Sequence, residues 1–131
     1  MDNTVIPMSE GAKCSCGASV VGIFPCAGAS NVGQLSNAVA VELHKQGVGN
    51  MMCTVGIGGK INGLLKSAEG CGSIIVIDGC PLNCAQATME EAGIPIGKHI
   101  LLTDMDIKKN KDLDLDPAQV KEVLSKVTEL L

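Results

Sequence analysis

The chain of 131 residues contains no tryptophan, no tyrosine and no arginine, and Phe24 is its one phenylalanine. Proteins that recognise nucleic acids rely on arginine to grip phosphates and guanine, and on aromatic rings to stack against single-stranded bases. Because this chain lacks these residues and carries a net charge of −4, we expect no nucleic-acid partner. The missing arginine also excludes a cysteine-dependent phosphatase loop, which closes its phosphate-binding site with that residue.

Long hydrophobic runs are absent as well. No stretch reaches the roughly 20 consecutive apolar residues that cross a membrane. The best candidate, residues 18–24, lies too far into the chain for a signal peptide and lacks the basic start of one. We therefore expect no membrane partner, and a location in the reducing cytoplasm.

The residues that are present have an ordinary globular composition, with 46% hydrophobic and 18% charged residues. Short apolar runs, which we interpret as strands, span residues 19–24, 51–55, 73–78 and 99–103. Segments with a helical pattern follow each run, at residues 31–46, 60–69, 81–92 and 117–131. This alternation predicts an α/β fold of doubly wound type, with about four parallel strands and helices on both faces of the sheet.

The remaining segments are predicted to be irregular. Residues 1–18 show no periodicity, and we interpret them as a cysteine-containing N-terminal arm that precedes a single α/β metal-binding domain at residues 19–131. The glycine-rich stretch 56–59 and the polar stretch 104–116 are predicted loops.

Two of the helices carry clear boundary signals. Ser30 or Asn31 can cap the first helix, and Gly47 can end it. Asp116 and Pro117 provide an acidic N-cap and a proline at the first helical position of the last helix.

The most informative feature of the composition is seven cysteines, at positions 14, 16, 26, 53, 71, 80 and 84. An odd number of cysteines in a cytosolic chain favours metal or thiol chemistry over a disulfide framework. Ligands of open α/β sheets bind at the carboxyl ends of the strands. Cys26, Cys53 and Cys80 each lie at or just after the end of a predicted strand, and Cys84 lies in the first turn of the next helix. If the strand order is 2-1-3-4, these four side chains converge.

The segment Asp78 to Cys84 is the sharpest local signal. Gly79 permits a tight turn, and Pro81 suits the first position of a helix. Cys80 and Cys84 are four residues apart, so we expect them on one face of the helix start, where the helix dipole favours thiolates. Thiolates are preferred ligands of tetrahedral Zn²⁺. We therefore expect one zinc ion per chain, and Asp78 is a candidate for a supporting hydrogen bond.

With these cysteines and this segment, the chain resembles the DGC-domain family, whose members are described as candidate zinc-binding proteins. The resemblance covers most of residues 14–104 and is carried by Pro25–Gly33, Met52-Cys53 with residues 56–59, and Asp78–Ala85. The cysteines that the family uses as zinc ligands match Cys26, Cys53, Cys80 and Cys84. The resemblance implies a metal site and no particular reaction.

Two other functions are open. In a thiol or redox enzyme, Cys80 would be the nucleophile, and Cys84 or Cys26 would resolve the intermediate. In a small-molecule binding module, backbone amides near Gly56 to Gly59 would hold a small anion. That stretch matches neither glycine-rich phosphate-binding template, because the required third glycine and the Ser or Thr after Lys60 are missing.

The other polar candidates have less specific interpretations. Cys14 and Cys16 are either an auxiliary metal-capturing or resolving pair, or simply exposed thiols. Cys71 precedes the third strand, at the end of the sheet opposite the other cysteines, and we interpret it as structural. We interpret the four remaining candidates as solvated-loop, surface or core residues: Asp104, Asp106, His44 and His99.

Overall fold

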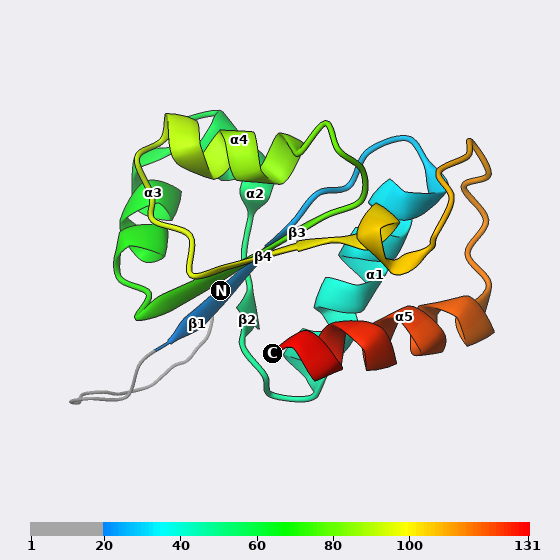
Figure 1. The fold of residues 1–131 in the computed structure, drawn as a ribbon. Coiled ribbons are helices and arrows are strands. Elements are labelled where there is room, and N and C mark those ends of the chain that lie inside the picture. The colour runs from blue at the N-terminus through cyan, green and yellow to red at the C-terminus, as the bar shows by residue number, and fades with distance from the viewer. Residues whose placement is uncertain (1–19) are drawn as a thin grey trace.

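Residues 20–131 are described by a computed structural model, and they form an α/β fold (Figure 1). The sheet has four parallel strands in the order β2-β1-β3-β4. The strands are β1 (Val21–Pro25), β2 (Asn50–Met51), β3 (Ser73–Asp78) and β4 (Lys98–Leu101). The predicted fold class and strand order are therefore confirmed. The proposed arm at residues 1–18 lies outside the described residues.

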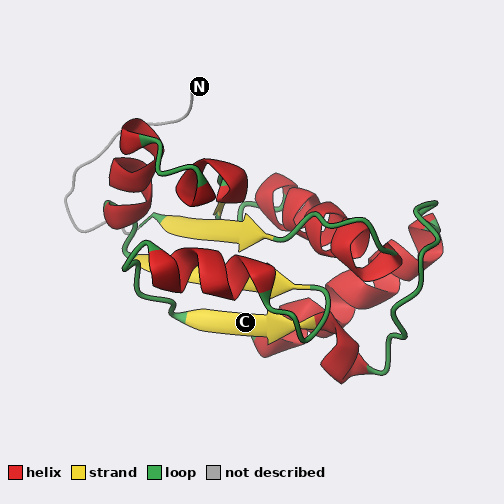
Figure 2. Ribbon diagram, turned by 90° about the horizontal axis from the view of Figure 1, so that it is seen from above, coloured by secondary structure: helices red, strands yellow, loops and turns green. Residues whose placement is uncertain are grey.

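Helices cover both faces of this sheet, as Figure 2 shows from above. The helices are α1 (Asn31–Lys45), α2 (Thr54–Gly58), α3 (Asn62–Glu69), α4 (Cys84–Glu91), the 3-10 helix η2 (Leu102–Met105) and α5 (Pro117–Leu130). Helices α1 and α5 share one hydrophobic cluster with the sheet, and α2, α3 and α4 share the other. Within residues 20–131, no helix is long and apolar enough to cross a membrane.

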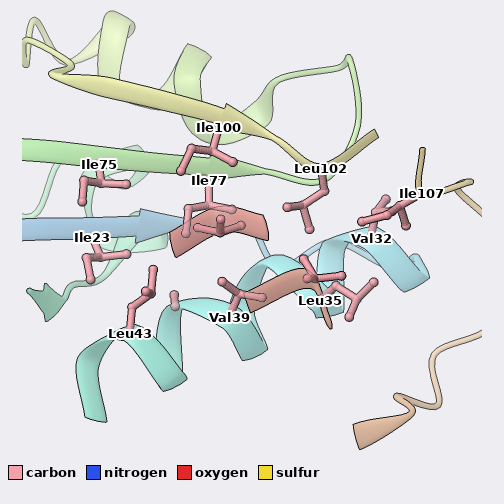
Figure 3. Packing of buried hydrophobic residues seen from close by; sticks show 13 residues of the cluster. Ile23, Val32, Leu35, Val39, Leu43, Ile75, Ile77, Ile100, Leu102 and Ile107 are labelled. Atoms are coloured by element: carbon pink, nitrogen blue, oxygen red, sulfur yellow. The ribbon is translucent and has the colours of Figure 1, made fainter. Parts of the chain in front are cut away.

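Strand β3 is the centre of the core because both of its faces are buried. Ile75 and Ile77 pack toward α1 and α5, whereas Ile74 and Val76 pack toward α2, α3 and α4. An uninterrupted β-branched run of this kind is typical of a parallel strand covered on both sides. Figure 3 shows the first of these layers, with the isoleucines of the sheet above the aliphatic side chains of α1.

The predicted boundaries of α1 and α5 are correct. Ser30 caps α1 by accepting a hydrogen bond from the Gly33 amide at 3.1 Å. Gly47, just beyond the helix, has a left-handed φ of 79°. Asp116 caps α5 by accepting from Ala118 N at 3.0 Å. These signals act within a few residues, which is why the sequence alone reveals them.

The region after β1 and α1 differs from its prediction. The second strand has only two residues, and Thr54–Gly58 forms helix α2 where residues 56–59 were predicted to be a loop. The glycine at position 56 makes this possible, because a Cβ atom there would collide with the Leu64 side chain of α3. The glycines at 56–59 therefore allow close helix packing instead of an open loop.

Helix α4 also begins later than predicted, at Cys84 instead of Pro81. The preceding residues form a turn, in which Asn83 N donates to Cys80 O at 3.0 Å and Asn83 takes a left-handed φ of 54°. Cys80 therefore lies outside the helix, and the prediction that Cys80 and Cys84 share a helix face is wrong. The fourth strand ends at Leu101, and the chain continues as η2.

Candidate functional site

A pocket of about 600 Å³ opens at the carboxyl ends of β1 and β3. Helix α1, which follows β1, and helix α4, which follows β3, pack on opposite faces of the sheet, so the pocket lies at the topological switch point of the fold. The cysteines that line it are Cys26, Cys80 and Cys84. We call this cavity the strand-tip pocket. It brings together three of the four cysteines that the sequence predicted to converge.

Cys26 joins the two loops that border the pocket. Its amide donates to Ile77 O at 2.9 Å, and its sulfur accepts a hydrogen bond from Gly79 N at 3.3 Å. A Cβ atom at Gly79 would lie 2.6 Å from the backbone of Val32. Only glycine therefore lets the loop after β3 pass so close to α1. In this position the Gly79 amide lies within hydrogen-bond distance of the Cys26 sulfur.

Cys80 has a cationic neighbour that the sequence analysis missed. The Nζ atom of Lys109 lies 3.5 Å from the Cys80 sulfur, and both residues line the strand-tip pocket. Buried Asn31 fixes the segment around this lysine: its side chain donates to Lys108 O at 2.7 Å and accepts from Asn110 N at 2.6 Å. No local pattern signals these contacts, since the partners are almost 80 residues apart in the chain.

Cys84 is the first residue of α4, and Asp78 fixes the start of that helix. The buried carboxylate of Asp78 accepts hydrogen bonds from Ala85 N at 2.8 Å and Gln86 N at 3.0 Å. It also contacts His99 Nε2 at 2.9 Å. A carboxylate at a helix N-terminus stabilises the helix. Asp78 thus supports the site by positioning α4 rather than by bonding directly to a sulfur.

His99 was interpreted as a surface or core residue, and its pairing with Asp78 was not foreseen. The register places His99 opposite Val76, two residues before Asp78 in β3. The two side chains are therefore diagonal neighbours on one face of the sheet. The strand pairing, once known, would have revealed this contact.

Cys53 lies beside the strand-tip pocket and is not among the residues that line it. It is exposed, and its sulfur caps α2 by accepting from Gly56 N at 3.4 Å. The next residue, Thr54, lines the pocket and donates to Pro25 O at 2.8 Å. Cys53 is therefore next in the chain to a residue of the pocket wall, and its own sulfur serves as the cap of α2.

For metal binding, the cysteine sulfurs of the described residues would have to lie closer together than they do in this structure. Among the described residues 20–131, no three His, Cys, Asp or Glu side chains are grouped closely enough to hold a metal ion. The chemistry of the donors nevertheless fits a thiophilic cation, because the thiols of Cys26, Cys80 and Cys84 line a single pocket. A metal ion would have to draw these sulfurs together.

Cys71 lies at the opposite end of the sheet, as predicted. Its sulfur contacts Met52 Sδ and Ser67 O, each at 3.5 Å, and both sulfurs lie over the bare backbone of Gly22. Burial raises the pKa of the Cys71 thiol above its ordinary value of 9.0. Cys71 therefore packs as a neutral side chain. Cys14 and Cys16 lie outside the described residues.

The remaining candidates do not line the strand-tip pocket. His44 Nδ1 accepts a hydrogen bond from Met51 N at 3.0 Å and so ties α1 to the edge strand β2. Asp104 lies in η2, and Asp106 lines a separate polar cavity of about 300 Å³.

Three amides of the glycine-rich stretch that is proposed to hold an anion have partners inside the chain. The amide of Gly56 donates to the Cys53 sulfur, Ile57 N donates to Cys53 O, and Gly59 N donates to Val55 O. Gly58 and Gly59 contribute to the wall of the strand-tip pocket instead.

Comparison with known proteins identifies the family to which the chain belongs. The chain is similar to the anaerobic and virulence modulator AnvM of Pseudomonas aeruginosa, with 28% identity over 109 residues that cover 83% of each protein. No solved structure matches the chain. The model of the DGC domain matches residues 22–127, which include all of β1 except Val21, the whole of β2 to β4 and every residue of the strand-tip pocket. The chain therefore belongs to the DGC domain family.

Proposed function

We propose that the protein binds one zinc ion through the cysteines of the strand-tip pocket, in a structural, sensing or metal-handling role. The observation that carries this proposal is the meeting of Cys26, Cys80 and Cys84 in one pocket. They come from two segments far apart in the sequence, the loop after β1 and the turn that leads from β3 into α4, and thiolates are preferred zinc ligands.

The fourth ligand in this proposal is Cys53. Its sulfur would exchange the hydrogen bond from Gly56 N for a bond to the metal. Four thiolates around Zn²⁺ leave a net charge of about −2 and no open coordination position, which disfavours hydrolytic chemistry. The ammonium group of Lys109 and the amide of Gly79 next to the sulfurs would offset part of that charge.

A sensing role agrees with the relative of this chain. AnvM is named an anaerobic and virulence modulator, and a zinc–thiolate centre that gains or loses its metal would suit a modulator. As part of the proposal we place the protein in the cytoplasm, where thiolate ligands stay reduced.

The direct test is the metal content of protein purified from zinc-supplemented cells without a chelator. We expect about one zinc ion per chain in the wild type, measured by elemental analysis. Removing the metal with a chelator and adding zinc back should restore that ratio. Wild-type protein that neither retains nor takes up zinc would contradict the proposal.

A second candidate function is a thiol enzyme in which Cys80 is the nucleophile and Cys84 or Cys26 the resolving thiol. The contact between Lys109 and the Cys80 sulfur favours it, because a cation beside a cysteine stabilises negative charge on sulfur. The two functions differ in their metal content and reactivity. One rapidly alkylated cysteine at position 80 in a protein free of zinc would favour the enzyme.

A further inference from the structure

The strand-tip pocket is much larger than a metal ion needs. Its volume of about 600 Å³ lies within the range of roughly 300–1,000 Å³ that is typical of pockets for small organic ligands. A zinc ion with bonds of about 2.3 Å to sulfur would occupy only a small part of this volume. The rest of the space is available to another molecule.

The wall of this remaining space is mainly apolar. Its apolar side chains are Pro25, Ala27, Ala29, Val32, Val55 and Ala85. Val55 is 83% exposed, so most of its aliphatic side chain is accessible to a bound molecule. Covering such a wall with an aliphatic group is favourable by roughly 25 cal/mol for each Å² removed from water.

The pocket carries charge of one sign. Among the described residues that line it, Lys109 is the one charged side chain, and no carboxylate is present. Within residues 20–131, Lys109 forms no ion pair. The Asn31 side chain donates to Lys108 O and accepts from Asn110 N, so it holds the backbone on both sides of the lysine.

From these observations we infer that the strand-tip pocket binds a small amphipathic anion. The anionic group, such as a carboxylate, pairs with Lys109, and the aliphatic part lies against the wall that includes Val55. This inference goes beyond zinc binding and does not depend on it. It also places the anion at Lys109 instead of at the amides of residues 56–59, of which those of Gly56, Ile57 and Gly59 have partners inside the chain.

Three simple probes test the chemistry of the ligand, each titrated by calorimetry into the protein as purified. Octanoate has both features, acetate has the charge without the chain, and octylamine has the chain with the opposite charge. We expect octanoate to bind at least about tenfold more tightly than either of the others, since it gains both contributions. Equal binding of octanoate and octylamine would overturn the inference.

Matched variants test the location. Lys109→Gln should weaken octanoate about fivefold, as expected for a partly exposed ion pair, and Val55→Asp should abolish octanoate binding by placing a carboxylate in the apolar wall. The controls are Lys111→Gln and Leu113→Asp, which change exposed residues outside the pocket and should bind like the wild type. If Lys109→Gln and Lys111→Gln bind octanoate equally, the site lies elsewhere and the inference is wrong.

The zinc content of the same samples separates this inference from the proposed function. If the protein contains no zinc and binds octanoate in a way that depends on Lys109, the anion site is supported and only the proposed zinc site is contradicted. Zinc at one ion per chain together with no preference for octanoate supports the metal centre and overturns the anion site.

Discussion

The two ends of the parallel sheet place cysteines in opposite kinds of surroundings. At the carboxyl end, Cys26, Cys80 and Cys84 line an open pocket, where the Cys26 sulfur accepts from an amide and the Cys80 sulfur from an ammonium group. At the amino end, Cys71 packs against a methionine, and burial raises its pKa. The same residue type is therefore a candidate ligand at one end and a packing residue at the other. Position in the fold, more than the number of cysteines, decides the chemistry.

The largest expected difference between the two ends is in zinc binding. Cys80→Ser and Cys84→Ser should each reduce bound zinc to less than about a tenth of the wild-type amount and lower the melting temperature by more than about 10 °C, because metal binding stabilises the folded state. Cys71→Ser should retain zinc. Elemental analysis and calorimetry measure both effects. If Cys71→Ser loses zinc while Cys80→Ser keeps it, the assignment of the two ends is reversed.

The next effect is on stability, and it concerns the support of the carboxyl end. Asp78→Asn should lower the free energy of unfolding by about 2–4 kcal/mol, because the buried carboxylate accepts bonds from two α4 amides and contacts His99. Asp104→Asn, at an exposed position in η2, serves as the matched control and should change it by less than about 0.5 kcal/mol. Urea unfolding measures both. Equal stabilities would show that Asp78 does not fix α4.

A third comparison uses reactivity. In metal-free protein at pH 8, Cys71 should react with iodoacetamide at least about tenfold more slowly than Cys80 or Cys84, because the thiolate is the reactive form and burial disfavours it at Cys71. Mass spectrometry of timed digests measures each site. Comparable rates would mean that the amino end opens readily to solvent.

A smaller effect follows from the raised pKa of Cys71. Its thiol stays protonated in the folded state at pH values where the unfolded chain already loses this proton. The contribution of this thiol to the free energy of unfolding is complete below the ordinary pKa of 9.0. It is lost as the pH rises through the raised pKa of Cys71 in the folded state. The wild type should therefore lose stability above about pH 9 more steeply than Cys71→Ala. Urea midpoints between pH 8 and 10 compare the slopes; parallel curves would contradict the prediction.

The smallest expected effect is that of deleting residues 1–17. The proposed ligands all lie beyond this segment, so the shortened protein should keep its zinc and its melting temperature within about 2 °C. Zinc loss together with a large fall in melting temperature would instead identify Cys14 and Cys16 as ligands.

Local chemistry explains which parts of the fold could be predicted. The β-branched run of β3, the Ser30 and Asp116 caps and the left-handed Gly47 each act within a few residues. The placement of Cys26, Cys80 and Cys84 along one pocket follows from strand order, since the carboxyl ends of neighbouring parallel strands lie at one edge. These features needed no knowledge of distant contacts.

The errors and omissions arise from contacts between distant segments. The start of α4 depends on Asp78, which caps it from β3, and the helical state of residues 54–58 depends on packing against Leu64. Lys109 reaches the pocket because Asn31 binds the segment around it. From the sequence alone, a polar segment of this kind is interpreted as a solvated loop, because its distant hydrogen-bond partner is not known.

The hydrogen bonds that Asn31 forms with Lys108 and Asn110 also imply an order of events during synthesis of the chain. The ribosome produces the chain from its N-terminus, so all four proposed ligands have been made by residue 84, before β4 and Lys109 exist. If the proposed zinc site forms, its sulfurs are therefore synthesised before the lysine that lies beside Cys80. Only when residues 108–110 emerge and dock on Asn31 does the pocket acquire its positive charge. The last charge added to the site arrives from the part of the chain that is translated late.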